Sequence, residues 1–98
     1  MITSKERARL RGLAQSLDSV TQVGKQGVTE ALLKSLEQTI DKRELIKVTV
    51  LENSGLDVKS IGEEIAKKLH AEFVCATGRK FVIYKYSNKE GVKHIQFD

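Results

Sequence analysis

Two glycines three positions apart, Gly24 and Gly27, enclose Lys25 and Gln26 and could bring a backbone close to a phosphate group. Glycine has no Cβ, so the main chain at both positions could approach a ligand closely. Thr29, two residues further on, is a good helix cap, and free N–H groups at a helix start can bind phosphate oxygens. The segment therefore predicts a turn that could bind an anion, although an ordinary connecting turn has the same pattern.

The glycine spacing matches no common nucleotide-binding fingerprint. A dinucleotide site needs a G-x-G-x-x-G run, and a P-loop needs a longer glycine spacing followed by Lys and Ser/Thr. The two glycines alone are a weak signal, and their context between a predicted strand and a predicted helix is a stronger one.

Side chains that could catalyse a reaction or hold a metal ion are scattered along the sequence. Cys75 lies in an apolar run, where a small buried side chain is expected. His70 ends a predicted helix and His94 lies in a predicted tail, and neither has a carboxylate cluster beside it. We therefore predict no enzyme, no metal site, no cofactor and no small-molecule substrate; a small enzyme that uses Cys75 or a histidine is a weaker alternative.

The composition favours one small basic domain. The chain has 98 residues, of which 40% are hydrophobic, and 17 Lys+Arg against 13 Asp+Glu give a net charge of +4. This charge is compatible with nucleic acid or an anionic membrane surface, but it is weak evidence on its own. No apolar stretch is long enough to span a bilayer, the first residues lack the apolar core of a signal peptide, and one cysteine fits a reducing compartment. A soluble, cytoplasmic protein without a membrane partner is expected.

Hydrophobic periodicity predicts the elements that must position the glycine loop. Thr3 and Glu6 have the spacing of a capping box before the first helix, and Asp57 is expected to cap the third. The predicted helices are 4–17, 29–40 and 57–70, and the predicted strands are 19–23, 44–52, 72–77 and 80–86.

The strand at 44–52 shows the clearest alternation. Ile46, Val48 and Val50 share one face, and a mixed set shares the other, which places the strand in the middle of a sheet. In the third helix, Gly62 is expected on the outer side.

The element order helix, strand, helix, strand, helix, strand, strand predicts an α/β (α+β) two-layer sandwich. Three helices would pack on a four-stranded mixed sheet, because strands separated by helices favour crossover connections and the last two strands form a hairpin. The predicted domain covers residues 1–86, and residues 87–98 form a polar C-terminal tail of uncertain order.

Four segments together resemble the YhbY family, the single-domain bacterial form of the CRM RNA-binding module. They occur in the family's order and spacing and cover roughly residues 10–86. The segments are "LRGLAQSL" (10–17), "VGKQGVT" (23–29), "RELIKV" (43–48) and "TGRKFVIYK" (77–85).

The resemblance implies the same fold and an RNA partner. Members of the family associate with precursors of the large ribosomal subunit, so it implies a role in ribosome assembly, with ribosomal RNA as partner and ribosomal proteins as further partners. The family's Gly-x-x-Gly loop is similar to the loop with which KH domains hold a nucleic-acid backbone. Carried over to this chain, the loop is Gly24, Lys25, Gln26 and Gly27.

Further basic residues would extend an RNA-binding surface if the strand and hairpin positions face the same way. Tyr84 could stack on a base, although a strand tyrosine is more often buried. The cations Lys5, Arg7, Arg9 and Arg11 of the first helix either face phosphates or are simply solvated. The additional candidate contacts are Lys42, Arg43, Lys47, Arg79, Lys80 and Lys85.

A protein–protein adaptor is the alternative function. Such an adaptor would reach pre-ribosomal particles through a ribosomal protein, without direct RNA contact. Its basic faces would then serve only to keep the protein in solution. Direct RNA binding through lysines predicts a steep dependence on salt, whereas an adaptor predicts none.

Overall fold

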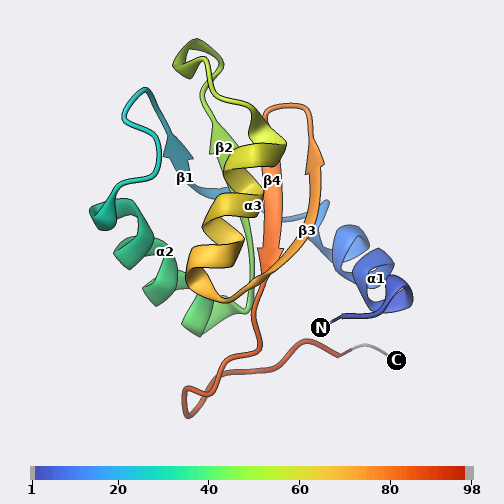
Figure 1. Ribbon diagram of the computed structural model, residues 1–98. Coiled ribbons are helices and arrows are strands. Elements are labelled where there is room, and N and C mark those ends of the chain that lie inside the picture. The colour runs from blue at the N-terminus through green and yellow to red at the C-terminus, as the bar shows by residue number, and fades with distance from the viewer. Residues whose placement is uncertain (1, 97–98) are drawn as a thin grey trace.

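The computed structural model describes residues 2–96; the predicted tail residues Phe97 and Asp98, and Met1 of the predicted domain, lie outside the described residues. The elements follow the predicted order, and the fold class of three helices with a four-stranded mixed sheet is confirmed (Figure 1). The helices are α1 (Ser4–Ala14), α2 (Glu30–Arg43) and α3 (Val58–Leu69), with a short 3-10 helix at Glu52–Ser54. The strands are β1 (Ser19–Val23), β2 (Leu45–Val50), β3 (Glu72–Thr77) and β4 (Lys80–Tyr84).

The sheet has the strand order β1-β2-β4-β3. β1 and β2 are parallel because α2 connects them, and β4 is antiparallel to both β2 and β3. β3 and β4 form the predicted hairpin, with Gly78 at a φ of 61° in the turn.

Local capping explains where each helix begins. Thr3 and Glu6 form the predicted capping box, Thr29 accepts a hydrogen bond from the Leu32 amide, and Asp57 accepts one from the Ser60 amide. α2 continues to Arg43, three residues beyond its predicted end. Its last turn is polar but basic, and cations near a helix C-terminus are favourable.

Helices cover both faces of the sheet. The larger core lies between α2, α3 and the strand face that carries Ile46, Val48 and Val50, as predicted. On the other face, Leu10 and Ala14 of α1 pack with a second apolar cluster. The predicted two-layer arrangement is therefore correct for α2 and α3 only, since α1 adds a partial third layer behind the sheet (Figure 1).

The prediction that Gly62 lies on the outer side of α3 was wrong. Gly62 is buried, and a Cβ built there would lie 2.6 Å from Phe73 Cε1 and 2.9 Å from Phe81 Cγ. The two phenylalanine rings therefore occupy the space that a side chain at this position would need.

Three connections gather at one end of the sheet: the β1–α2 loop, the β2–α3 loop and the β3–β4 hairpin (Figure 1). The end of α2 and the C-terminal segment lie at the opposite end (Figure 1). This division decides which of the predicted site residues can act together.

Residues 87–96 contain no helix or strand, but the segment is attached to the domain. The amides of Ser87 and Ile95 and the ring of His94 all bind the buried carboxylate of Glu44. Within residues 2–96, His94 therefore has a single carboxylate partner, which the sequence did not indicate because it lies 50 residues away. The boundary after residue 86 stays a prediction.

Candidate nucleic-acid interface

The GKQG turn (Gly24–Gly27) is a tight turn with an exposed tip. The Gly27 amide donates a hydrogen bond to the Gly24 carbonyl at 2.9 Å, and the exposed Lys25 and Gln26 lie between them. Gly27 has a φ of 68°, a conformation that favours glycine. The turn thus presents a cation and a polar side chain to solvent two residues before the cap of α2.

The two glycines serve different purposes. Gly24 has no positive φ, and a Cβ at this position would meet only Leu51 Cδ1, at an ordinary contact distance of 3.6 Å. Conformation therefore requires glycine at position 27, whereas position 24 has room for a methyl group. The predicted close approach of a ligand to the main chain stays a prediction at both positions.

Arg79 is committed to the protein's own backbone. Its half-buried side chain donates hydrogen bonds to the carbonyl oxygens of Val50 at 3.1 Å, Leu51 at 2.9 Å and Leu56 at 3.3 Å. These bonds tie the β3–β4 hairpin to the β2–α3 loop. Its predicted contact with RNA stays a prediction, and the observed contacts give Arg79 a positioning role.

A polar row crosses all four strands beside the GKQG turn. The strand register pairs Gln22 with Thr49, Thr49 with Lys80, and Lys80 with Thr77. Directly paired residues project from the same face of a sheet, and here this is the face that α1 covers in part. The row therefore connects the base of the turn to the hairpin along an uncovered part of the sheet.

A cationic cleft of about 520 Å³ lies where this face meets α1. Lys47, Lys80 and Arg11 line it, together with Gln15, Thr77 and Cys75. The sequence identified Arg11 only as one of four cations with either a solvated or a phosphate-facing role, because helical spacing alone does not show which strand residues it will face. The structure places Arg11 with two predicted site residues, Lys47 and Lys80.

The remaining predicted contacts lie at the opposite end. Lys42 and Arg43 end α2, and Lys85 follows β4, whose last residue, Tyr84, pairs with Leu45 at the start of β2. The predicted surface is therefore divided between two ends of the sheet. Tyr84 is 6% exposed, and burial raises its pKa, as expected for a core tyrosine.

Other cations of α1 are used structurally. Arg7 donates from Nη1 to the carbonyl oxygens of Phe73 and Val74 in β3. Arg9 donates from Nε to the Gln96 carbonyl at 3.5 Å. Arg11 is therefore the α1 arginine that faces the cleft.

Cys75 and His70 both have structural roles in the fold. Burial raises the pKa of the half-buried Cys75 thiol, which disfavours the reactive thiolate. His70 caps the end of α3 in a left-handed conformation.

Within residues 2–96, no three His, Cys, Asp or Glu side chains are grouped so that they could hold a metal ion. Nor does that part of the chain contain a helix with the length and apolar character to cross a lipid bilayer.

Comparison with known proteins gives consistent matches over most of the chain. Residues 2–85 match the model of the CRS1/YhbY (CRM) domain. The chain is 36% identical over 89 residues to the "Probable RNA-binding protein YqeI" of Bacillus subtilis, covering 91% of this chain and 93% of that protein. It is 29% identical over 92 residues to a Haemophilus influenzae protein named "RNA-binding protein", covering 94% of this chain and 93% of that protein.

The fold also matches a solved structure. The solution structure of the Staphylococcus aureus protein SAV1595 superimposes with a TM-score of 0.79 at 38% sequence identity, covering 92% of this chain and 94% of that one. The match supports the arrangement of helices and strands described above.

Proposed function

Because the chain belongs to the CRS1/YhbY (CRM) domain family, we propose that it binds structured RNA through the GKQG turn and the adjoining basic surface. The observation that carries this proposal is the polar row and cationic cleft beside the turn. Lys25 lies at the turn tip, Lys80 lies in both the row and the cleft, and Lys47 and Arg11 complete the cleft. Two relatives named as RNA-binding proteins support the choice of RNA as the ligand.

The contact chemistry is mainly electrostatic. Lysine ammonium groups act as point charges toward phosphates, and the polar row offers hydroxyl and amide groups to the sugar–phosphate backbone. The binding free energy should therefore depend strongly on salt and weakly on sequence. The proposed mechanism recognises the phosphates and shape of a folded RNA and contains no catalytic step.

The proposed RNA is ribosomal RNA in precursors of the large subunit, bound during ribosome assembly in the cytoplasm. The resemblance of the four sequence segments to the YhbY family supports this choice. Crosslinking in cells, followed by mapping of the bound RNA, tests it. Enrichment of large-subunit precursor RNA is expected, and enrichment of unrelated RNA would contradict the assembly role.

A salt titration with a purified ribosomal RNA fragment tests direct binding. Lys25→Glu should weaken binding about tenfold at low salt and flatten the salt dependence, since it removes a phosphate contact at the turn tip. Lys67→Glu is the matched control, because Lys67 is exposed in the last turn of α3 and the charge change is identical. Failure of the wild type and both variants to bind the purified fragment would favour the adaptor, which has no direct RNA contact.

A further inference from the structure

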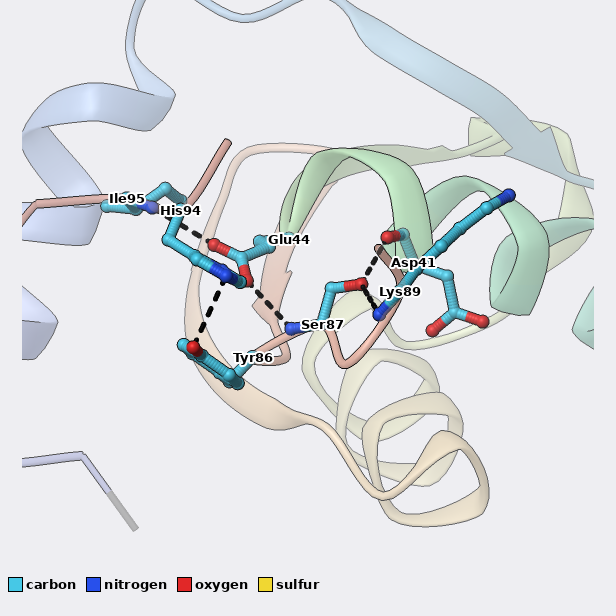
Figure 2. Close-up of polar contacts among 7 residues, drawn as sticks. All are labelled: Asp41, Glu44, Tyr86, Ser87, Lys89, His94 and Ile95. Atoms are coloured by element: carbon cyan, nitrogen blue, oxygen red, sulfur yellow. Dashed lines mark hydrogen bonds and ion pairs between the residues drawn. The ribbon is translucent and has the colours of Figure 1, made fainter. Parts of the chain in front are cut away.

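Glu44 holds a fully buried carboxylate at the end of α2. The residue is 0% exposed and has a φ of 65°, which is unusual for a residue other than glycine. Its carboxylate accepts hydrogen bonds from the Ser87 amide at 2.7 Å, the Ile95 amide at 3.0 Å and His94 Nδ1 at 2.7 Å (Figure 2). All three donors belong to the segment after β4.

This arrangement fixes the C-terminal segment at a cost in stability. Burying a carboxylate and placing a non-glycine residue at a positive φ are both unfavourable. Burial raises the pKa of Glu44, but the hydrogen bonds from Ser87, His94 and Ile95 outweigh it and hold the pKa below its ordinary value. The carboxylate therefore stays ionised and attaches the segment to the domain.

The network also orients an exposed aromatic pair. The Tyr86 and His94 rings stack with centroids 4.3 Å apart and planes within 9°, and Tyr86 Oη lies 3.2 Å from His94 Nε2 (Figure 2). Yet Tyr86 is 57% exposed, whereas the other large hydrophobic side chains of residues 2–96 are buried or partly buried. A buried network thus holds in place a ring that contributes little to the core.

The surroundings of the pair carry charges of both signs, since the hollow beside Tyr86 is lined by Lys85 and by the carboxylates of Glu6 and Glu72. Lys85 precedes Tyr86, and Lys93 precedes His94. Lys42 and Arg43 end α2 at the same end of the sheet, but they line a different hollow, with Ser35, Gln38 and Thr39. The acidic groups close in sequence are Asp41 and Glu90 as well as Glu44 itself.

We propose that the Tyr86–His94 pair is a second RNA contact, on which an unpaired nucleobase stacks while Lys85 and Lys93 bind its phosphates. Aromatic rings beside a positive surface are how proteins bind unpaired bases without strong sequence preference. Because the ring is already oriented, little side-chain freedom is lost on binding. The inference rests on the proposed RNA binding, and the pair lies beyond the residues that match the family model.

Two RNA probes separate stacking from phosphate contact: a hairpin with an unpaired loop and a blunt duplex of the same length. Tyr86→Leu should bind the hairpin about tenfold more weakly than the wild type and the duplex equally well, since stacking needs an unpaired base. Tyr86→Phe retains the ring and should stay within about twofold. The slope of affinity against salt should not change in either variant, unlike that of Lys25→Glu.

The amide resonances of Ser87 and Ile95 report whether the segment stays bound to Glu44 in each variant. With these resonances unchanged, hairpin binding by Tyr86→Leu equal to that of the wild type would overturn the inference and leave the proposed function intact. Equal losses on hairpin and duplex would also overturn it, because bases within a duplex are already stacked on both faces and offer none to Tyr86. Failure of the wild type to bind either probe would instead contradict the proposed function itself.

Discussion

Arg79 donates a hydrogen bond from Nη2 to the carbonyl oxygen of Leu51 at 2.9 Å. The amide of Leu51 in turn donates to the carbonyl oxygen of Val23, also at 2.9 Å, directly before the GKQG turn. The hairpin, the β2–α3 loop and the turn are therefore joined by consecutive hydrogen bonds. Arg79 positions the turn through Leu51.

Removing the donors of Arg79 should destabilise the protein. Arg79→Met keeps an apolar stem but leaves the carbonyls of Val50, Leu51 and Leu56 without their charged donor. We expect about 1–3 kcal/mol less free energy of unfolding, measured by urea denaturation. Lys80→Met, at the exposed neighbouring position, should change the free energy of unfolding by less than about 0.5 kcal/mol. Similar small effects at both positions would contradict the positioning role.

A methyl group at Gly62 should be poorly tolerated. Gly62→Ala brings a Cβ to within 2.6 Å of Phe73 Cε1, so the rings must move, at a cost of about 1–3 kcal/mol. Gly12→Ala in α1 is the matched control, because nothing lies within 4 Å of its Cβ. There the free energy of unfolding should rise by about 0.5–1 kcal/mol, as alanine favours the helix. Thermal unfolding of the two variants should therefore shift in opposite directions.

The features of the fold that depend on residues close together in sequence could be predicted from the sequence. The caps at Thr3, Thr29 and Asp57 depend on residues three positions apart, and the faces of β2 depend on simple alternation, so the sequence contained both. The order of elements followed from the same periodicity.

The burial of Gly62 and Glu44 could not be predicted in this way. A glycine contributes no apolar signal to a helical stripe, and the rings that cover Gly62 come from β3 and β4. The donors to Glu44 lie more than 40 residues away in sequence. The hydrogen bonds from Arg79 to backbone carbonyls could not be predicted either, because their acceptors are also distant in sequence. At the site, the sequence located the cations but not their division between two ends of the sheet.

The two glycines of the GKQG turn should respond differently to alanine. Gly27→Ala places a side chain at a φ of 68° and should lower the free energy of unfolding by about 1–2 kcal/mol. Gly24→Ala should leave it nearly unchanged, because its Cβ makes only an ordinary contact with Leu51. A loss of RNA affinity in Gly24→Ala, with an unchanged melting temperature, would then report a close approach of RNA to the main chain. Unchanged affinity would limit the turn's role to Lys25 and Gln26.

Glu44 should make the stability depend on pH in the acidic range. Its pKa in the folded protein is below the ordinary value of 4.5, so the unfolded chain takes up the proton first as the pH falls. The stabilisation is therefore fully present above about pH 4.5 and is lost as the pH falls through the folded pKa.

Glu44→Gln isolates this contribution. The neutral amide offers one acceptor oxygen and turns its NH2 group toward another donor, so at pH 7 we expect a free energy of unfolding about 1–3 kcal/mol below that of the wild type. The titratable groups that do not contact Glu44 are the same in both proteins, so the difference between the two unfolding curves reports Glu44 together with its partner His94. This difference should shrink as the pH is lowered from 5 toward 3, and a difference independent of pH would show that the carboxylate's charge does not hold the C-terminal segment.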